Sequence, residues 1–162
     1  MNKGKAMLSE EAKKEIEKAL RKYPNKRSAV MDALRSAQKA RGGHLEKADM
    51  DEIAVILEMQ SVEVNAAAAF YTMYNIDKPV GRHHIQVCRN ISCSLLGAEH
   101  LIKHMERTLN IKTGETTPDK RITLSTVECL GSCGTAPMMQ INDDFHENLT
   151  EAKVDEILKG LK

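Results

Sequence analysis

The stretch that decides the fold is Cys129-Leu-Gly-Ser-Cys133-Gly-Thr-Ala-Pro137, and it carries two of the chain's four cysteines. The other two, Cys88 and Cys93, have four residues between them, and 35 residues separate the two pairs. Two tight pairs that use every cysteine indicate a single site with four sulfur ligands. Because thiolates are soft ligands, we expect either zinc or an iron–sulfur cluster at this site.

The alternative use of four cysteines is a pair of disulfides, and it depends on the compartment. The first residues, Met1 to Ser9, hold no apolar stretch of signal-peptide length and no Arg-rich amphipathic pattern. No apolar run in the sequence approaches the roughly 20 residues of a membrane span, so we expect no direct membrane insertion. These features predict a cytoplasmic chain, and a reducing compartment favours metal binding over disulfides.

The charge balance argues against a phosphate-backbone partner. The net charge is +1; residues 1–78 carry 14 basic and 12 acidic side chains, and residues 79–162 carry 10 and 11. Neither part has the positive excess that nucleic acid or an anionic membrane surface attracts. We therefore expect no nucleic-acid partner.

Residues 1–78 have the periodicity of a helical bundle. Four apolar stripes at helical spacing predict four helices, near residues 10–20, 29–41, 49–58 and 61–73. Ser9 and Ser61 are candidate N-caps, and Gly42-Gly43 ends the second helix. The pattern changes at Asp77-Lys78-Pro79-Val80-Gly81, which predicts a boundary between a bundle of residues 1–78 and a second domain of residues 79–162.

The second domain has the pattern of a small α/β sandwich. Alternating apolar residues predict strands at 84–88, 122–126 and 138–141 and a short one near 145–146. Helices are expected over 95–109 and after Thr150, which is a candidate N-cap. Both cysteine pairs then follow strands directly. If those two strands are neighbours in the sheet, both pairs emerge at one end of it.

The loops around the cysteines favour a metal centre. Gly131 and Gly134 tolerate positive φ and allow backbone amides to approach sulfur closely. Cys93 is expected at or just before a helix N-terminus, where the helix dipole favours a thiolate. Spacing alone leaves structural zinc and an iron–sulfur cluster equally open.

The run from Cys129 to Pro137, with Asp119-x-x-Ile122-Thr123 upstream of it, resembles the signature of a known family, the small [2Fe-2S] subunit (the E subunit) of NADH:quinone oxidoreductase. The other segments that match spread over nearly the whole sequence: Tyr23 to Ala29, Gln38, Gly42-Gly43, Phe70-Tyr71-Thr72-Met73, Met139 to Asp143 and Leu149-Thr150. The family more often has Phe at the position of Ile122 and an aromatic at that of His44. Those departures concern local packing.

The resemblance implies an α/β fold: a thioredoxin-like [2Fe-2S] ferredoxin domain preceded by an N-terminal helical bundle. It implies a [2Fe-2S] cluster as the cofactor, with Cys88, Cys93, Cys129 and Cys133 as its ligands. The implied function is electron transfer within an NADH dehydrogenase module, with no activity of the protein alone. The family also serves NAD-linked or bifurcating hydrogenases and formate dehydrogenases, so these remain alternatives. A zinc-stabilised interaction module is the more remote one.

The partners that the resemblance implies are two further subunits. One is a flavoprotein that binds FMN and NADH and carries a [4Fe-4S] cluster, and the other is a larger iron–sulfur subunit. Such a complex would hold the protein peripheral to the inner membrane. The sequence has no Gly-x-Gly-x-x-Gly run and no Walker A motif, so we expect FMN and NADH in the partner alone. The Phe70-Tyr71 pair is a candidate part of the docking face.

Two histidines also share a predicted helix face, since His100 and His104 are spaced i, i+4. That spacing can bind metal. No carboxylate or cysteine is obviously placed to complete a site with them, so we expect a solvated pair.

Overall fold

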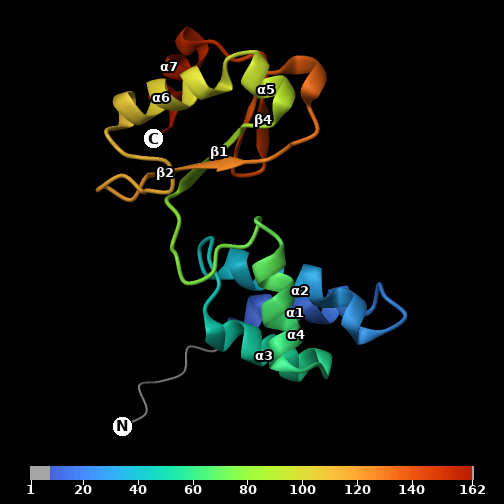
Figure 1. Cartoon of the computed structure of the whole chain (residues 1–162). Helices are drawn as coiled ribbons and strands as arrows, with labels where there is room; N and C mark the ends of the chain where they lie inside the picture. The colour runs from blue at the N-terminus through green and yellow to red at the C-terminus, as the bar shows by residue number, and fades with distance from the viewer. Residues whose placement is uncertain (1–7, 162) are drawn as a thin grey trace. The chain divides into compact units, whose positions relative to one another are not determined.

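The computed structural model describes residues 8–161, and the chain divides into two compact units, Met1–Pro79 and Val80–Lys162 (Figure 1). Each unit has an apolar core of its own. Within the described residues, no helix has both the length and the apolar character needed to cross a bilayer. Residues 1–7, on which most of the expectation about a leader rests, lie outside the described residues.

The first unit is a helical bundle. Its helices are α1 Glu10–Leu20, the 3-10 turn Lys26–Ala29, α2 Val30–Ala40, α3 Lys47–Leu57 and α4 Ser61–Phe70. Ser9 caps α1 as predicted, because its side chain accepts a hydrogen bond from the Ala12 amide at 3.2 Å. The expected apolar stripes form the core, which is rich in alanine and contains one aromatic residue, Tyr74.

The start of α4 differs from the prediction. The N-cap is Gln60, which forms a capping box with Glu63, and the Gln60 amide donates to Glu63 Oε2 over 3.1 Å. The Ser61 hydroxyl donates instead to Asp51 in α3. The helix ends at Phe70 rather than near Met73, because Tyr71 is already in an extended conformation.

A buried ion pair joins α2 to α3. Arg41 follows α2 and donates from Nε and Nη2 to the two carboxylate oxygens of Asp49, both at 2.5 Å. Asp49 also accepts a hydrogen bond from the Glu46 amide at the start of α3. Its buried carboxylate therefore accepts three hydrogen bonds in all. The hydrogen bond to Asp49 raises the pKa of Arg41.

The second unit is a four-stranded sheet with helices packed on it. Its strands are β1 His83–Cys88, β2 Ile122–Val127, β3 Met139–Ile141 and β4 Asp144–His146, in the order β2-β1-β3-β4. β1 pairs parallel with β2 and antiparallel with β3, and β4 pairs antiparallel with β3. The helices are α5 Ile91–Leu95, α6 Ala98–Leu109 and α7 Glu151–Gly160, with a 3-10 turn at Cys133–Thr135.

The core of this unit lies on one face of the sheet. Alternate strand residues, such as Ile85 and Val87 of β1, are buried together with apolar residues of α6 and α7. Both helices lie on the same side of the sheet in Figure 1. Thr150 caps α7, as predicted. The single helix expected over 95–109 is instead two, because Gly97 adopts a φ of +95° and separates α5 from α6.

Candidate metal centre

The parallel pairing of β1 and β2 brings the two cysteine pairs to one end of the sheet. Cys88 is the last residue of β1 and stands in register with Val127, the last residue of β2. Cys129 follows two residues after that point, and Cys93 returns towards it within α5. Two segments that lie far apart in the sequence therefore supply sulfur to the same place.

The outer pair has the spacing of two ligands on one metal. The Sγ atoms of Cys129 and Cys133 lie 3.9 Å apart, whereas a disulfide would hold them about 2.05 Å apart. Two metal–sulfur bonds of about 2.3 Å at a tetrahedral angle place their sulfurs about 3.8 Å apart. All four cysteines are free thiols in this structure. The geometry of this pair therefore fits a tetrahedral metal ion better than a disulfide.

The inner pair lies in an apolar environment. Cys88 and Cys93 are 2% and 1% exposed and pack with Ala98 and Met138, whereas the other two cysteines are exposed. Burial raises the pKa of the Cys93 thiol, and a hydrogen bond with Cys88 adds to the effect. Without a cation nearby, burial favours the protonated thiol; a bound metal ion reverses that preference because it is held by thiolates.

The position of Cys93 differs from the expectation. It is the third residue of α5 rather than a residue at or before a helix N-terminus. Its own helix is a single turn, capped by Asn90, whose side chain accepts from the Ile91 amide at 2.9 Å. Burial, rather than a helix dipole, is therefore the main influence on this sulfur.

The loop between Cys129 and Cys133 is shaped by one glycine, not by two. Gly131 adopts a φ of +82°, and its amide donates to Cys129 Sγ at 3.4 Å. Gly134 lies in the 3-10 turn Cys133–Thr135 and has no positive φ, so the expectation for this second glycine was wrong. The amide–sulfur contact expected of this loop is present at Gly131.

A carboxylate that sequence reasoning missed anchors the same loop. The hydroxyls of Ser132 and Thr135 both donate to Glu147 Oε1, the second of them at 2.6 Å. These hydrogen bonds lower the pKa of Glu147, the one to Ser132 most strongly. Glu147 lies 14 residues beyond Cys133, after two strands, so no local motif connects it with the site. The hairpin of β3 and β4 returns it to the loop.

In residues 8–161, no three His, Cys, Asp or Glu side chains are grouped so as to hold one metal ion. A binuclear iron–sulfur cluster takes two protein ligands on each iron and spreads the four sulfurs over two metals. The four thiolates of the two pairs match the number of protein ligands that such a cluster takes.

The histidine pair is solvated only in part, because the His100 side chain is 67% exposed, as expected, whereas that of His104 is 17% exposed. His104 of α6 pairs with Asp155 Oδ1 at 2.7 Å and with Glu151 Oε1 at 3.1 Å, and His100 pairs with the same Glu151 oxygen at 2.9 Å. Both carboxylates come from α7, about 50 residues downstream, so spacing within α6 gave no sign of them. The group ties α6 to α7.

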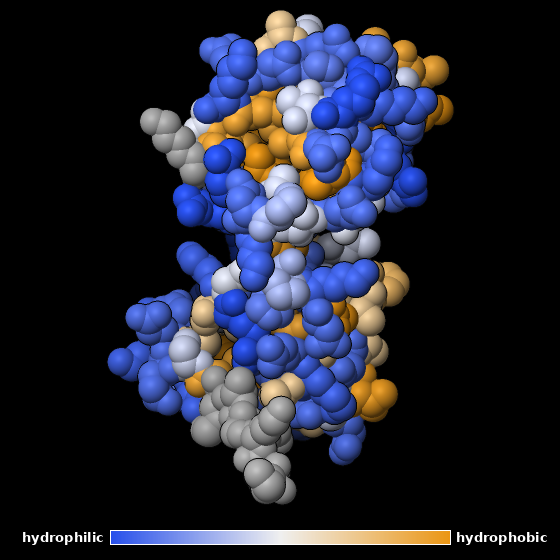
Figure 2. Space-filling view, turned by 90° about the vertical axis from the view of Figure 1, so that its left-hand side faces the viewer, coloured by the Kyte–Doolittle hydropathy of each residue, from blue (hydrophilic) through white to orange (hydrophobic). Residues whose placement is uncertain are grey.

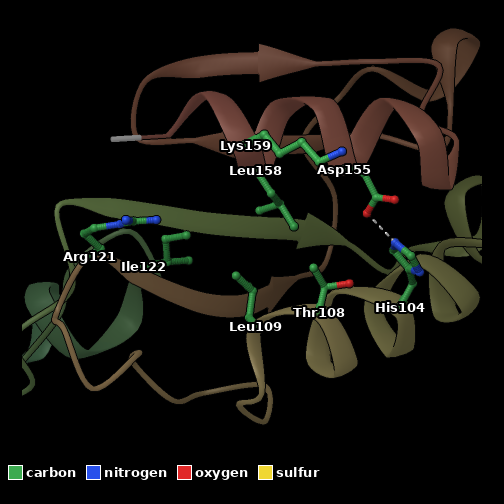
Figure 3. Close-up of a pocket in the computed structure, with 8 residues that line it drawn as sticks. All are labelled: His104, Thr108, Leu109, Arg121, Ile122, Asp155, Leu158 and Lys159. Carbon is green, nitrogen blue, oxygen red and sulfur yellow. Dashed lines mark hydrogen bonds and ion pairs between the residues drawn. The ribbon is translucent and has the colours of Figure 1, made fainter.

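A cavity of about 370 Å³ lies beside this group. Its lining residues are His104, Thr108, Leu109, Arg121, Ile122, Asp155, Leu158 and Lys159 (Figure 3). Figure 2 shows an apolar hollow in the same unit, ringed by hydrophilic residues. None of the cavity's lining residues is a cysteine, so it is separate from the cysteine site.

Comparison with known proteins identifies the family. The chain matches the thioredoxin-like [2Fe-2S] ferredoxin family over residues 16–162. It is 49% identical over 150 residues to the E 2 subunit of the NADH-quinone oxidoreductase of Rhizobium meliloti (strain 1021), covering 93% of this chain and 88% of that protein. It is 43% identical over 145 residues to the E subunit of the NADH-quinone oxidoreductase of Rickettsia prowazekii (strain Madrid E), covering 88% of this chain and 81% of that one.

The fold also recurs in a solved structure. A chain of an NAD+-reducing [NiFe]-hydrogenase in the air-oxidised state superimposes with a TM-score of 0.64 at 23% identity, covering 83% of this chain and 22% of that chain. That likeness concerns the fold alone. The family match and the two relatives extend over most of the sequence, beyond the cysteine loops. The chain therefore belongs to the thioredoxin-like [2Fe-2S] ferredoxin family, its cofactor is a [2Fe-2S] cluster, and its role is electron transfer.

Proposed function

We propose that Cys88, Cys93, Cys129 and Cys133 are the four ligands of the [2Fe-2S] cluster, two thiolates to each iron. The observation that carries this assignment is the meeting of both pairs at one end of the sheet, with the outer sulfurs at 3.9 Å. When bound, the cluster accepts and donates one electron at a time.

The surrounding residues would hold and tune the cluster rather than perform chemistry. Ala98 and Met138 keep water from the inner sulfurs. The Gly131 amide stabilises negative charge on Cys129. Ser132, Thr135 and Glu147 fix the outer loop. This arrangement supports a carrier with no substrate site of its own.

We further propose that the electrons come from the FMN of a partner flavoprotein within an NADH:quinone oxidoreductase. NADH delivers a hydride, whereas the cluster takes single electrons, so a flavin must divide the pair. The names of the curated relatives support this assembly. The partner would bind FMN, NADH and a [4Fe-4S] cluster, and a larger iron–sulfur subunit would complete the module, peripheral to the inner membrane on its cytoplasmic side.

The second candidate is the same role in an NAD-linked hydrogenase, because a chain of such an enzyme shares the fold. Identities of 49% and 43% with NADH-quinone oxidoreductase subunits, against 23% with the hydrogenase chain, favour the first assignment. In either assembly, we propose that residues 79–162 form the domain that holds the cluster and that residues 1–78 form a separate helical domain.

The test begins with the anaerobically purified protein. We expect a reddish-brown protein with two irons and two sulfides per chain, and loss of colour when any one of the four cysteines is changed to alanine. Ser36→Ala in α2, which lies outside the cysteine-bearing segment, is the control and should keep the iron. Stoichiometric zinc without visible absorption would instead support a zinc-stabilised interaction module.

The role within the complex is tested by reduction of the cluster. NADH alone should leave the visible absorption unchanged, and NADH with the flavoprotein subunit should bleach it promptly. Prompt bleaching by NADH alone, in a preparation free of flavin, would contradict the proposal that only the partner subunit binds FMN and NADH.

A further inference from the structure

The segment between β4 and α7 is hydrogen-bonded to the loop that carries the outer cysteines. The amide of Asn148 donates to the carbonyl of Thr135 at 2.7 Å, and the amide of Leu149 donates to the carbonyl of Pro137 at 2.9 Å. We call residues 147–149 the anchor segment. Its two backbone bonds fix the part of the loop that leads into β3.

The side chain of Glu147 holds the loop nearer to its second cysteine. Its Oε1 atom accepts hydrogen bonds from the hydroxyls of Ser132 and Thr135, the second of them at 2.6 Å. The two hydroxyls also lie 2.9 Å from each other, so three oxygens form one compact group. Ser132 precedes Cys133 directly and Thr135 follows it by two positions. The carboxylate therefore restrains the chain on both sides of that cysteine.

The anchor segment is itself held by α7. The Lys153 ammonium donates to the Glu147 carbonyl at 2.6 Å, and the Lys153 amide donates to the side chain of Thr150, the cap of the helix, at 3.2 Å. The backbone of Glu147 is thus fixed independently of the loop. A carboxylate on a rigid support loses little conformational freedom when it accepts the two hydroxyls.

Packing holds the inner cysteines more firmly than the outer pair. Cys88 and Cys93 are 2% and 1% exposed within an apolar cluster, whereas Cys129 and Cys133 are exposed to solvent. Protons and competing chelators, which displace a metal from its thiolates, therefore reach the outer pair first. The outer thiolates depend on the hydrogen bonds of their loop to stay in place.

We propose that Glu147 is a positioning residue for Cys133 and that it sets the rate at which the outer iron is lost. The inference rests on the function proposed above, in which Cys133 is a ligand of the cluster. Glu147 acts through the hydroxyls of Ser132 and Thr135, which keep the Cys133 thiolate close to its iron. A thiolate on a restrained loop rebinds its iron before the metal leaves, because the loop keeps it at a high effective concentration.

The experiment measures iron release from the full-length protein that carries its cluster. The parent is compared with Glu147→Ala, which removes the acceptor, and with Glu147→Gln, whose Oε1 can accept from both hydroxyls without the charge. A Ser132→Ala/Thr135→Val double variant removes both donors instead. Each protein is purified anaerobically, and the transfer of iron to an excess of a chelator is followed by absorbance.

Glu106→Ala is the matched control. Glu106 Oε1 of α6 likewise accepts from a threonine hydroxyl, that of Thr113 at 3.2 Å, and also from the Thr113 amide at 2.9 Å. The change therefore removes a comparable group of hydrogen bonds within the second unit, in the loop that follows α6 rather than in the cysteine loop. A general loosening of the unit would speed iron release in this variant as well.

We expect Glu147→Ala to release iron about tenfold faster than the parent, since two hydrogen bonds to a carboxylate are lost. Glu147→Gln should release it about threefold faster, because hydrogen bonds to a neutral acceptor are about half as strong. The double variant should match Glu147→Ala, and the Glu106→Ala control should match the parent.

A triple variant that combines Glu147→Ala with both hydroxyl substitutions tests whether the carboxylate acts through the hydroxyls. It should release iron no faster than Glu147→Ala alone, because the same hydrogen bonds cannot be lost twice. Additive effects, which would reach about a hundredfold in the triple variant, would overturn the assignment.

The remaining outcomes also decide the matter. Glu147→Ala at the parent's rate, or a control as fast as Glu147→Ala, would overturn the positioning role and leave the proposed function intact. Glu147→Gln as fast as Glu147→Ala would overturn it too, because the charge alone would then account for the effect. A parent that holds no iron after anaerobic reconstitution would overturn the proposed ligands themselves, and the role of Glu147 with them.

Discussion

The backbone amide of Gly131 donates a hydrogen bond to Cys129 Sγ over 3.4 Å, and the φ of +82° at Gly131 turns that amide towards the sulfur. An L-residue with a side chain rarely adopts this φ. This backbone hydrogen bond to an outer sulfur therefore depends on the absence of a side chain at residue 131.

We predict that Gly131→Ala weakens the cluster site and that Gly134→Ala does not. Alanine at residue 131 introduces a left-handed strain of about 1–2 kcal/mol, and relief of that strain moves the amide away from the sulfur. Gly134 has no positive φ, and an added methyl group there meets no atom within 4 Å. Iron per chain and the midpoint potential should fall in the first variant. Equal values in both variants would contradict a role for the Gly131 amide.

Residues 79–162 should fold alone and retain two irons per chain. All four cysteines lie in this segment, and the unit has its own apolar core. The Gly81 amide donates to Thr123 Oγ1 at 2.7 Å, so the start of the segment is tied to β2. Circular dichroism and iron analysis after anaerobic reconstitution check this. A folded segment that takes up no iron would show that the helical bundle is needed to complete the site.

Gly81→Ala should destabilise the second unit, because a Cβ there would lie 2.8 Å from the carbonyl carbon and oxygen of Arg121. Backbone atoms cannot move aside cheaply, so we expect a loss of about 1–3 kcal/mol in the free energy of unfolding. The control is Gly160→Ala at the end of α7, where nothing lies within 4 Å. The control should unfold at the parent's denaturant midpoint or slightly above it. If the denaturant midpoint of Gly81→Ala equals the parent's, the backbone before β1 can shift to accommodate the methyl group without loss of stability.

The stability of the fold should fall in mild acid in part through His84. Burial lowers the pKa of His84 from its ordinary value of 6.5, and its Nε2 lies 2.7 Å from Ser125 Oγ. The unfolded chain therefore takes up the proton first as the pH falls below about 6.5, and stability is lost until the folded pKa is reached. Urea unfolding at pH values of about 7.5 and about 5.5, on either side of that ordinary pKa, measures the loss. His84→Gln should lose less stability than the parent between these two values.

The apolar periodicity predicted several elements because those elements are governed by their own residues. Alternation in β1 and β2 indicated which side chains enter the core, and Ile85, Val87 and Leu124 do so. The cap residues Ser9 and Thr150 were also identified correctly, since a cap bonds to an amide only three positions away. Local rules suffice for contacts of this range.

Residue type alone gave wrong predictions at Ser61 and at Gly134, where the surrounding structure determines what the residue does. Ser61 is a good cap by type, but Asp51 of α3 engages its hydroxyl, and Gln60 caps the helix instead. Gly134 can adopt a positive φ, yet the 3-10 turn that contains it requires none. The residue type limits the backbone conformations and hydrogen bonds that are possible, and the contacts with neighbouring residues determine which of them forms.

The sequence by itself determined the four sulfur ligands we propose and the resemblance that names the cofactor, because cysteine count and spacing are properties of the chain. Tertiary structure determined the position and the solvent exposure of each sulfur, and the hydrogen bonds that hold the outer loop. The parallel pairing of β1 and β2 brings the pairs together, burial separates Cys88 and Cys93 from the exposed Cys129 and Cys133, and the β3–β4 hairpin delivers Glu147 to the loop. Burial and long-range hydrogen bonds depend on contacts between distant segments, so no local pattern could specify them.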